Sequence, residues 1–124
     1  MSTSLYERLG KTDGIRAIVE TALAAHLANP TIQKRYEPGA KDPEYWSKVV
    51  QHAVDFFEAG AGGPAKYQGK SMVEAHAGMN INGEEFLAVV DDIMGALGKH
   101  AVDQATQNEV LAILYSLKPE VVHL

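Results

Sequence analysis

Apolar residues recur along most of the chain at the three- and four-residue spacing that places them on one side of an α-helix. This spacing predicts four substantial helices, over residues 12–28, 42–59, 83–98 and 102–117. In the second of these, the apolar positions are Trp46, Val49, Val50, Ala53 and Phe57. No segment shows the two-residue alternation of a half-buried strand. We therefore predict an all-α fold.

Proline and glycine mark the ends of the predicted helices. Residues 60–64 combine three glycines with a proline and form the strongest break in the chain, followed by a short helix at about 71–77. Residues 31–36 are expected to form one short helical turn, and residues 37–43 a loop because of their proline and glycine content. Repeats and linkers are absent, so residues 1–124 are expected to form a single domain.

Composition excludes several kinds of site. The chain contains no cysteine, which excludes disulfides, thiolate zinc sites, iron–sulfur clusters and covalent haem attachment through a Cys-x-x-Cys-His motif. Its formal net charge of −5 disfavours nucleic-acid binding, which needs a basic face. It has no apolar run of the ~20 residues that span a membrane. The first residues lack the features of a signal peptide, so a cytoplasmic location is expected.

The five histidines separate by their surroundings. His100 lies in a polar segment and His123 beside the C-terminus, so both are expected to be exposed. His26 ends the first long helix on its apolar side, where a cationic imidazole would suit the helix C-terminus, and a structural role is expected. His52 and His76 remain as candidate ligands.

His76 lies on the short helix between Gly69 and Gly78, with Met72 four residues before it and Met79 three residues after it. At helical spacing, both methionines would share its face. A lone imidazole with soft apolar neighbours suits the proximal side of a haem iron, which takes a neutral imidazole nitrogen under apolar cover. Spacing alone leaves open a packed core histidine, which is the commoner case.

His52 borders the apolar stripe of helix 42–59, beside Val49 and Phe56 at helical spacing. The break at 60–64 lets the chain fold back, so that His52 and His76 would face each other across a slot suited to a flat apolar cofactor. The alternative is a histidine exposed on the flank of the helix.

The remaining charged residues have ordinary interpretations. Lys66 and Lys70 flank Tyr67, and they are either partners for haem propionates or solvated lysines on a loop. The carboxylates of Asp91, Asp92, Glu84 and Glu85 are expected on helix surfaces, with the two glutamates also suiting the positive end of their helix. Motifs for phosphate loops, zinc proteases and serine hydrolases are absent.

Four segments together resemble a known family. They are Leu5–Gly10 at the start, residues 62–70 before the short helix, Met72–Met79 around His76, and Gly83–Phe86 at the next helix. In order and spacing they are similar to the group I truncated haemoglobins, over nearly the whole chain. The resemblance implies a two-over-two helical sandwich enclosing haem b, with His76 as proximal ligand. It also implies cofactor contacts from Lys66, Tyr67, Lys70, Met72, Met79 and Phe86.

The opposite, distal side departs from the family pattern. Leu23 stands where relatives often have a tyrosine, Val49 where they have a glutamine, and Tyr36 where they have a phenylalanine. Leu23 and Val49 cannot donate a hydrogen bond, and the loss of one donor would cost bound oxygen about 1–3 kcal/mol. His52 or Tyr36 is expected to replace it. His52 also matches a position from which some relatives bring a second histidine to the iron.

The resemblance implies reversible binding of oxygen, carbon monoxide and nitric oxide at ferrous iron, with oxygen transport as the associated role. Nitric oxide dioxygenation, supported by a reductase, is an enzymatic alternative that the apparent loss of the distal tyrosine weakens. Electron transfer or peroxide chemistry at a six-coordinate iron is a third hypothesis, and it depends on His52. An interaction module without haem is the fourth.

Overall fold

The computed structural model describes residues 4–64, 67, 69 and 71–123. Its helices are α1 (Leu5–Arg8), α2 (Lys11–Ala28), α3 (Gln33–Ala40), α4 (Pro43–Gly60), α5 (Met72–His76), α6 (Gly83–Lys99), α7 (Gln104–Ser116) and the 3-10 helix η1 (Lys118–Glu120). Among these residues the extended pairing is confined to one isolated bridge, between Ile81 and Val122. The predicted all-α fold is therefore confirmed, and the four long helices begin and end within two residues of their predicted limits.

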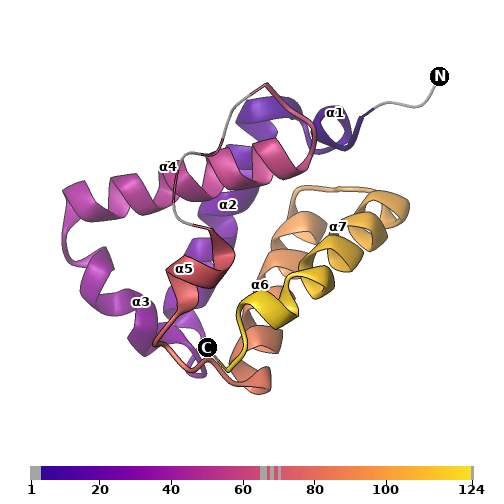
Figure 1. Cartoon of the computed structure of the whole chain (residues 1–124). Coiled ribbons are helices and arrows are strands. Elements are labelled where there is room, and N and C mark those ends of the chain that lie inside the picture. Colours follow the sequence, from indigo (N-terminus) through magenta and orange to yellow (C-terminus); the bar gives the residue numbers. More distant parts are fainter. Residues whose placement is uncertain (1–3, 65–66, 68, 70, 124) are drawn as a thin grey trace.

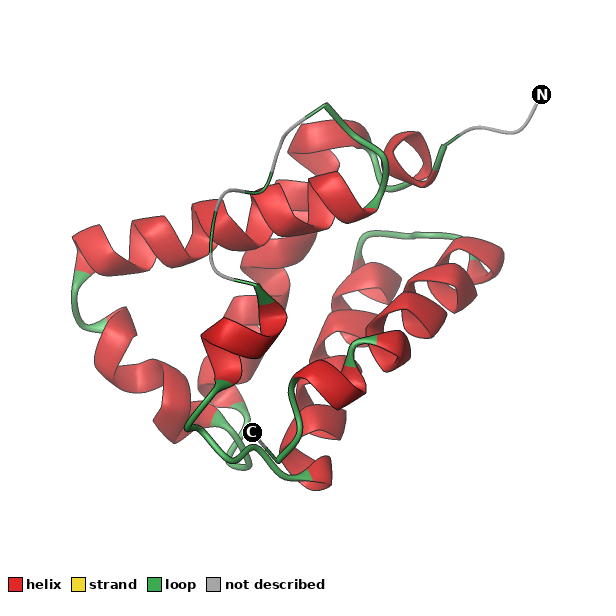
Figure 2. Ribbon diagram, in the orientation of Figure 1, coloured by secondary structure: helices red, strands yellow, loops and turns green. Residues whose placement is uncertain are grey.

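The long helices form two packed pairs. Helix α4 crosses α2, while α6 and α7 run side by side, and α2 also packs against α6 so that the pairs meet (Figure 1). The short helix α5 is drawn in front of α2 and below α4, with a loop on either side of it (Figure 2). This is the two-over-two arrangement that the resemblance implied.

The core lies where the two pairs meet. Its most deeply buried apolar side chains come from α2, α4 and α6, because each of these helices presents an apolar stripe to the others. These side chains include Ile15, Val54 and Leu97, each at most 2 % exposed. Their burial removes apolar surface from water and fixes the relative positions of the long helices.

Helix α3 corrects one expectation from the sequence. Residues 37–43 were expected to form a loop, but α3 continues to Ala40 with Pro38 inside it. A proline lacks one backbone N–H and so removes a single helical hydrogen bond, here the bond to the carbonyl of Lys34. The Gln33 side-chain amide donates to Glu37 at 2.9 Å across this turn, and α3 packs against both α2 and α4. Tertiary contacts thus outweigh the local preference.

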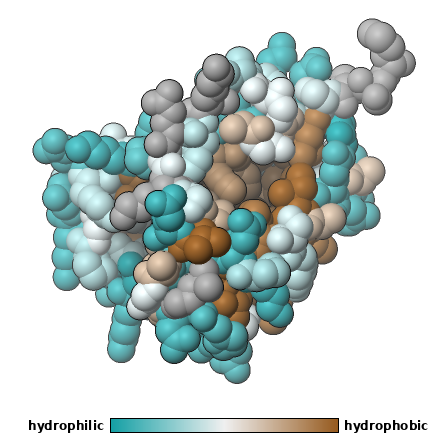
Figure 3. Space-filling view, in the orientation of Figure 1, coloured by the Kyte–Doolittle hydropathy of each residue, from teal (hydrophilic) through white to brown (hydrophobic). Residues whose placement is uncertain are grey.

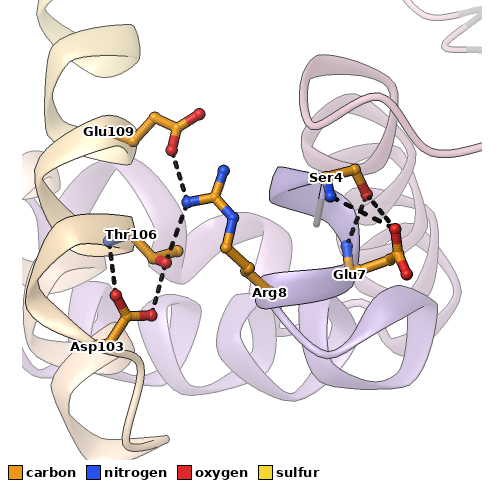
Figure 4. Close-up of polar contacts among 6 residues, drawn as sticks. All are labelled: Ser4, Glu7, Arg8, Asp103, Thr106 and Glu109. Carbon is orange, nitrogen blue, oxygen red and sulfur yellow. Dashed lines mark hydrogen bonds and ion pairs between the residues drawn. The ribbon is translucent and has the colours of Figure 1, made fainter. Parts of the chain in front are cut away.

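An ion-pair network attaches the first helix to the last long one (Figure 4). The Arg8 guanidinium on α1 reaches the Glu109 carboxylate at 2.7 Å and donates to the Thr106 hydroxyl at 3.3 Å. Thr106 is fully buried, and its hydroxyl donates to Asp103 at 2.6 Å, which also caps the start of α7. Arg8 therefore links α1 to a helix almost a hundred residues away in sequence.

The described helices include no segment that is both long and apolar enough to span a membrane.

We expect Leu97→Ala to lower the free energy of unfolding by about 2–5 kcal/mol, because Leu97 is buried and the surrounding helices leave a cavity when its side chain is removed. Leu87 is on the same helix but 44 % exposed, and Leu87→Ala should change the stability by less than about 0.5 kcal/mol. Urea unfolding followed by circular dichroism measures both. Equal losses in the two variants would contradict this placement of the core.

Candidate functional site

A cavity of about 470 Å³ opens between the two helix pairs. Its walls come from α2, α4, α5, α6 and α7, and are predominantly apolar; they include Ile18, Leu23, Val49, Phe56, Phe86, Val90, Val110 and Leu114. Figure 3 shows a hollow with apolar walls on this face of the molecule. Such a volume is in the range of cofactor and small-molecule sites.

Helix α5 places His76 at this cavity. Ser71 and Glu74 form a capping box that fixes the start of this short helix. His76 lines the cavity, and its Nδ1 donates to the Met72 carbonyl oxygen at 2.8 Å. A carbonyl oxygen accepts but cannot donate, so the proton of neutral His76 lies on Nδ1. This leaves the lone pair of Nε2 available for a metal ion.

Only one of the two methionines predicted beside His76 reaches the cavity. Met72 lines the cavity, but Met79 does not and is 37 % exposed. Helix α5 ends at His76, Ala77 is extended, and Gly78 has a φ of +83°. The helical spacing between His76 and Met79 therefore does not hold, and the cofactor contact expected of Met79 stays a prediction.

His52 on α4 also lines the cavity, although much of its surface is exposed. Its ring meets the edge of Tyr67, with ring centroids 6.4 Å apart, and Tyr67 in turn packs edge-on against Phe56 at 5.3 Å. The sequence left open whether His52 is exposed on the flank of its helix or faces the slot. In the structure it is exposed and also lines the cavity.

The other predicted site residues mostly meet at the same cavity. Leu23, Tyr36, Val49, Tyr67 and Phe86 all contribute to its lining. Lys66 and Lys70 lie outside the described residues, so their predicted propionate contacts stay predictions. Neither Leu23 nor Val49 carries a hydrogen-bond donor, as expected from the sequence.

A buried polar cluster was not predicted. His26 is 3 % exposed, and its Nδ1 lies 2.8 Å from the Asp92 carboxylate. The Asn29 side-chain amide donates to both oxygens of Asp92, at 3.2 and 3.3 Å. Asp92 therefore points toward the helix interface and binds His26, whereas a surface carboxylate was expected. Asp91 and Asp92 look alike in the sequence, but adjacent residues point to different sides of a helix.

The charge expected on His26 also needs correction. Burial lowers the pKa of His26 below its usual value of 6.5, and the hydrogen bond to Asp92 and its charge offset only part of this shift. The imidazole is thus neutral at neutral pH, and its structural role depends on hydrogen bonding and packing. Its ring stacks on Tyr36 with centroids 4.9 Å apart. Burial, and then the charge of Asp92, raise the pKa of the Tyr36 hydroxyl.

Glu85 departs from the surface role expected for it as well. Its carboxylate forms an ion pair with Arg35 of α3 while also accepting from the Asn82 backbone at the start of α6. The hydrogen bond from Arg35 lowers the pKa of Glu85. Arg35 also donates to the Met79 carbonyl at 3.2 Å. This arginine therefore connects α3 to the loop that follows His76.

The residues present fit a haem. A lone imidazole completes the ligand set of a metal that brings its own porphyrin nitrogens, and apolar walls suit the porphyrin faces. In the described part of the chain no group of three or more His, Asp or Glu residues is arranged to hold a bare metal ion. The two-over-two fold and this cavity together define the class of haem globins.

Comparison with known proteins assigns the family. The sequence model of the bacterial-like globin family matches residues 4–123 of the chain. The chain belongs to this family.

Individual relatives agree with the predicted subgroup. The chain is 32 % identical to the group 1 truncated haemoglobin of Synechocystis over 117 residues, covering 91 % of this chain and 90 % of the relative. It is 28 % identical to that of Tetrahymena pyriformis over 111 residues, covering 90 % and 88 %. These matches confirm the resemblance to group I truncated haemoglobins.

Solved structures show the same fold. The Fe(III) form of the truncated haemoglobin of Tetrahymena pyriformis matches with a TM-score of 0.88 at 25 % identity, covering 98 % of this chain and 100 % of that one. A 2/2 haemoglobin from Synechococcus, in the cyanomet state and with covalently attached haem, matches with a TM-score of 0.81 at 26 % identity, covering 94 % of each chain. The two-over-two fold is thereby confirmed.

We expect the stability of the protein to fall as the pH is lowered below about 6.5, the usual pKa of histidine. Because the folded pKa of His26 is lowered, the unfolded chain binds more protons in this range, and unfolding is favoured by at most about 1.4 kcal/mol per pH unit. His26→Gln removes this contribution. Urea midpoints across the pH range should therefore show a shallower slope for the variant. Parallel slopes would contradict a neutral buried His26.

Proposed function

We propose that this protein binds oxygen and other diatomic gases reversibly at the ferrous iron of haem b, with His76 as proximal ligand. The observation that carries the proposal is the hydrogen bond from His76 Nδ1 to the Met72 carbonyl, at the wall of an apolar cavity. It supports coordination through Nε2. The family membership supports the cofactor, and when bound, haem supplies the iron at which a gas ligand is held.

The apolar lining has two consequences for a bound gas. It excludes water from the cofactor, which favours reversible binding over oxidation. It also leaves few groups to stabilise the partial negative charge on bound oxygen, since Leu23, Val49 and Ala53 donate no hydrogen bond. His26, Tyr36, His52 and Tyr67 are the described polar residues that line the cavity away from α5. Of these, Tyr36 and His52 are the two that we predicted from the sequence as replacement donors.

A second candidate function follows from the position of His52. It lines the same cavity as His76 from a different helix, which supports a state in which both imidazoles coordinate the iron. Such a six-coordinate iron favours electron transfer over gas storage, because a gas must displace the second histidine. Nitric oxide dioxygenation, a reductase partner and a cytoplasmic location stay predictions from the sequence; nitrate formation from nitric oxide with a reductase would test the first.

We expect His76→Gly to abolish the normal spectrum of the carbon monoxide complex, because the iron loses its protein ligand. Free imidazole, added at millimolar concentration, should enter the vacated space and restore the spectrum. Absorption spectroscopy with and without carbon monoxide measures both effects. His123→Gly is the matched control, since His123 is exposed and is not among the residues that line the cavity. A normal spectrum for His76→Gly without imidazole would refute the proximal assignment.

We expect His52→Ala to convert a six-coordinate iron to a five-coordinate one in the absence of gas, and to speed carbon monoxide binding, since no internal ligand then competes. The ferric and deoxy-ferrous absorption spectra before and after the substitution measure the coordination number. Unchanged spectra in both oxidation states would exclude His52 as an iron ligand and, with it, the second candidate function.

A further inference from the structure

A carboxylate–imidazole pair lies at the wall of the cavity, separate from both candidate iron ligands. It consists of His26 on α2 and Asp92 on α6, joined by the 2.8 Å contact between Nδ1 and Oδ2. The Asn29 amide holds both oxygens of Asp92 from the end of α2. A carboxylate accepts, so the Nδ1 proton of His26 points to Asp92, and the carboxylate sets the tautomer of the ring.

The other ring nitrogen, Nε2, therefore carries a lone pair. Among the described residues, no hydrogen bond to Nε2 is present. In that part of the chain, every side-chain nitrogen that is fully buried has a hydrogen-bond partner, so Nε2 is not a fully buried atom. Nε2 thus retains access to open space, even though His26 as a whole is 3 % exposed. His26 is one of the residues that line the cavity. The role proposed below for His26 requires that this lone pair face the cavity.

The surroundings of His26 keep its ring in the unprotonated form that can act as a base. Tyr36 from α3 stacks on its ring, and Asp92 from α6 bonds to it; these are the ionisable groups in contact with the ring among the described residues. Burial keeps the imidazole neutral at neutral pH by lowering its pKa. When the ring becomes protonated, the charge of Asp92 stabilises the imidazolium, as a carboxylate does beside a general-base histidine.

We propose that His26 and Asp92 form a proton-accepting site for small weak acids that enter the cavity as neutral molecules and bind the cofactor as anions. Hydrogen cyanide, hydrogen sulfide and hydrogen peroxide are of this chemical class. This inference rests on the proposed haem function but adds an activity to it, because neutral diatomic gases carry no proton to remove.

The proton transfer balances without an oxidant or reductant. The bond between hydrogen and the anionic group of the acid breaks, its proton passes to Nε2 of His26, and its electron pair stays on the anion. The product is an imidazolium paired with Asp92 and an anion that is free to bind the ferric iron. Release of the anion returns the proton by the reverse path.

Hydrogen cyanide tests the proposal, since it is undissociated at neutral pH. All measurements use the haem-loaded protein carrying His52→Ala, which removes the other cavity-lining histidine both as an iron ligand and as a base. Stopped-flow absorption gives the rate constant for cyanide binding to the ferric form. We expect the additional change His26→Gln to lower it on the order of 100-fold, the usual contribution of a positioned base. Gln keeps a donor for Asp92 but is not basic.

Carbon monoxide separates proton acceptance from a packing role. It binds the ferrous form without releasing a proton, so His26→Gln should leave its rate constant within about twofold of the parent. Equal slowing of both ligands would overturn the proposal in favour of altered access. Normal carbon monoxide binding with an unchanged cyanide rate would also overturn it, while leaving the proposed gas binding intact. Failure to bind carbon monoxide in the parent would refute the proposed function itself.

Asp92→Asn and Asp91→Asn are a matched pair with the same change of charge on adjacent residues of α6. Asp92→Asn should slow cyanide binding, because a neutral amide stabilises the imidazolium less than a carboxylate does, and it no longer fixes the tautomer of the ring. Asp91 is exposed, and Asp91→Asn should leave the rate unchanged. Nitrogen NMR of the diamagnetic carbon monoxide complex should show the Nε2 lone pair of His26 in the parent. A protonated Nε2 in the parent would overturn the proposal.

Discussion

The hydrogen bond from His76 to the Met72 carbonyl is the interaction on which the rest of the site depends. It spans a single helical turn, so it exists only while that turn is helical. Five residues are too few to form a stable helix alone, because nucleation costs more than so few bonds return. The capping box at Ser71 and the packing of α5 against η1 therefore support the orientation of one imidazole.

The long helices form the walls of the cavity at which α5 places His76. Helices α2, α4 and α6 bury most of the core and leave between them a cavity that side chains do not fill. A protein interior is normally packed without such space, so an apolar cavity of this size indicates a site for a large group. The apolar surface that faces the cavity is thus available to a cofactor, but it is not packed against other side chains in a way that would stabilise the fold.

The sequence predicted the fold, and it placed His76 at the cavity, for identifiable reasons. Helical periodicity locates long helices reliably, since each must bury one stripe of apolar side chains. His76 was found because glycines isolate its helix and because its neighbourhood resembles a known family. Neither signal requires knowledge of which distant residues touch in the folded chain.

The missed features are long-range pairs. His26 and Asp92 are 66 residues apart, and Arg35 and Glu85 are 50 residues apart, so no local pattern links either pair. Two other expectations failed for different reasons. Met79 was expected on the same helix face as His76, but α5 ends at His76 and the helical spacing stops there. Helix α3 was shortened because proline content outweighed contacts that only the folded chain provides.

The bridge between Ile81 and Val122 has a consequence for how the protein matures. The His123 backbone N–H also donates to the Ile81 carbonyl at 2.8 Å. Val122 and His123 therefore hold the loop that follows α5. During synthesis, residues 122 and 123 are added only after the loop that they hold. A nascent chain therefore lacks this support for the loop after α5 until residues 122 and 123 have left the ribosome, and this part of the cavity wall becomes ordered only then.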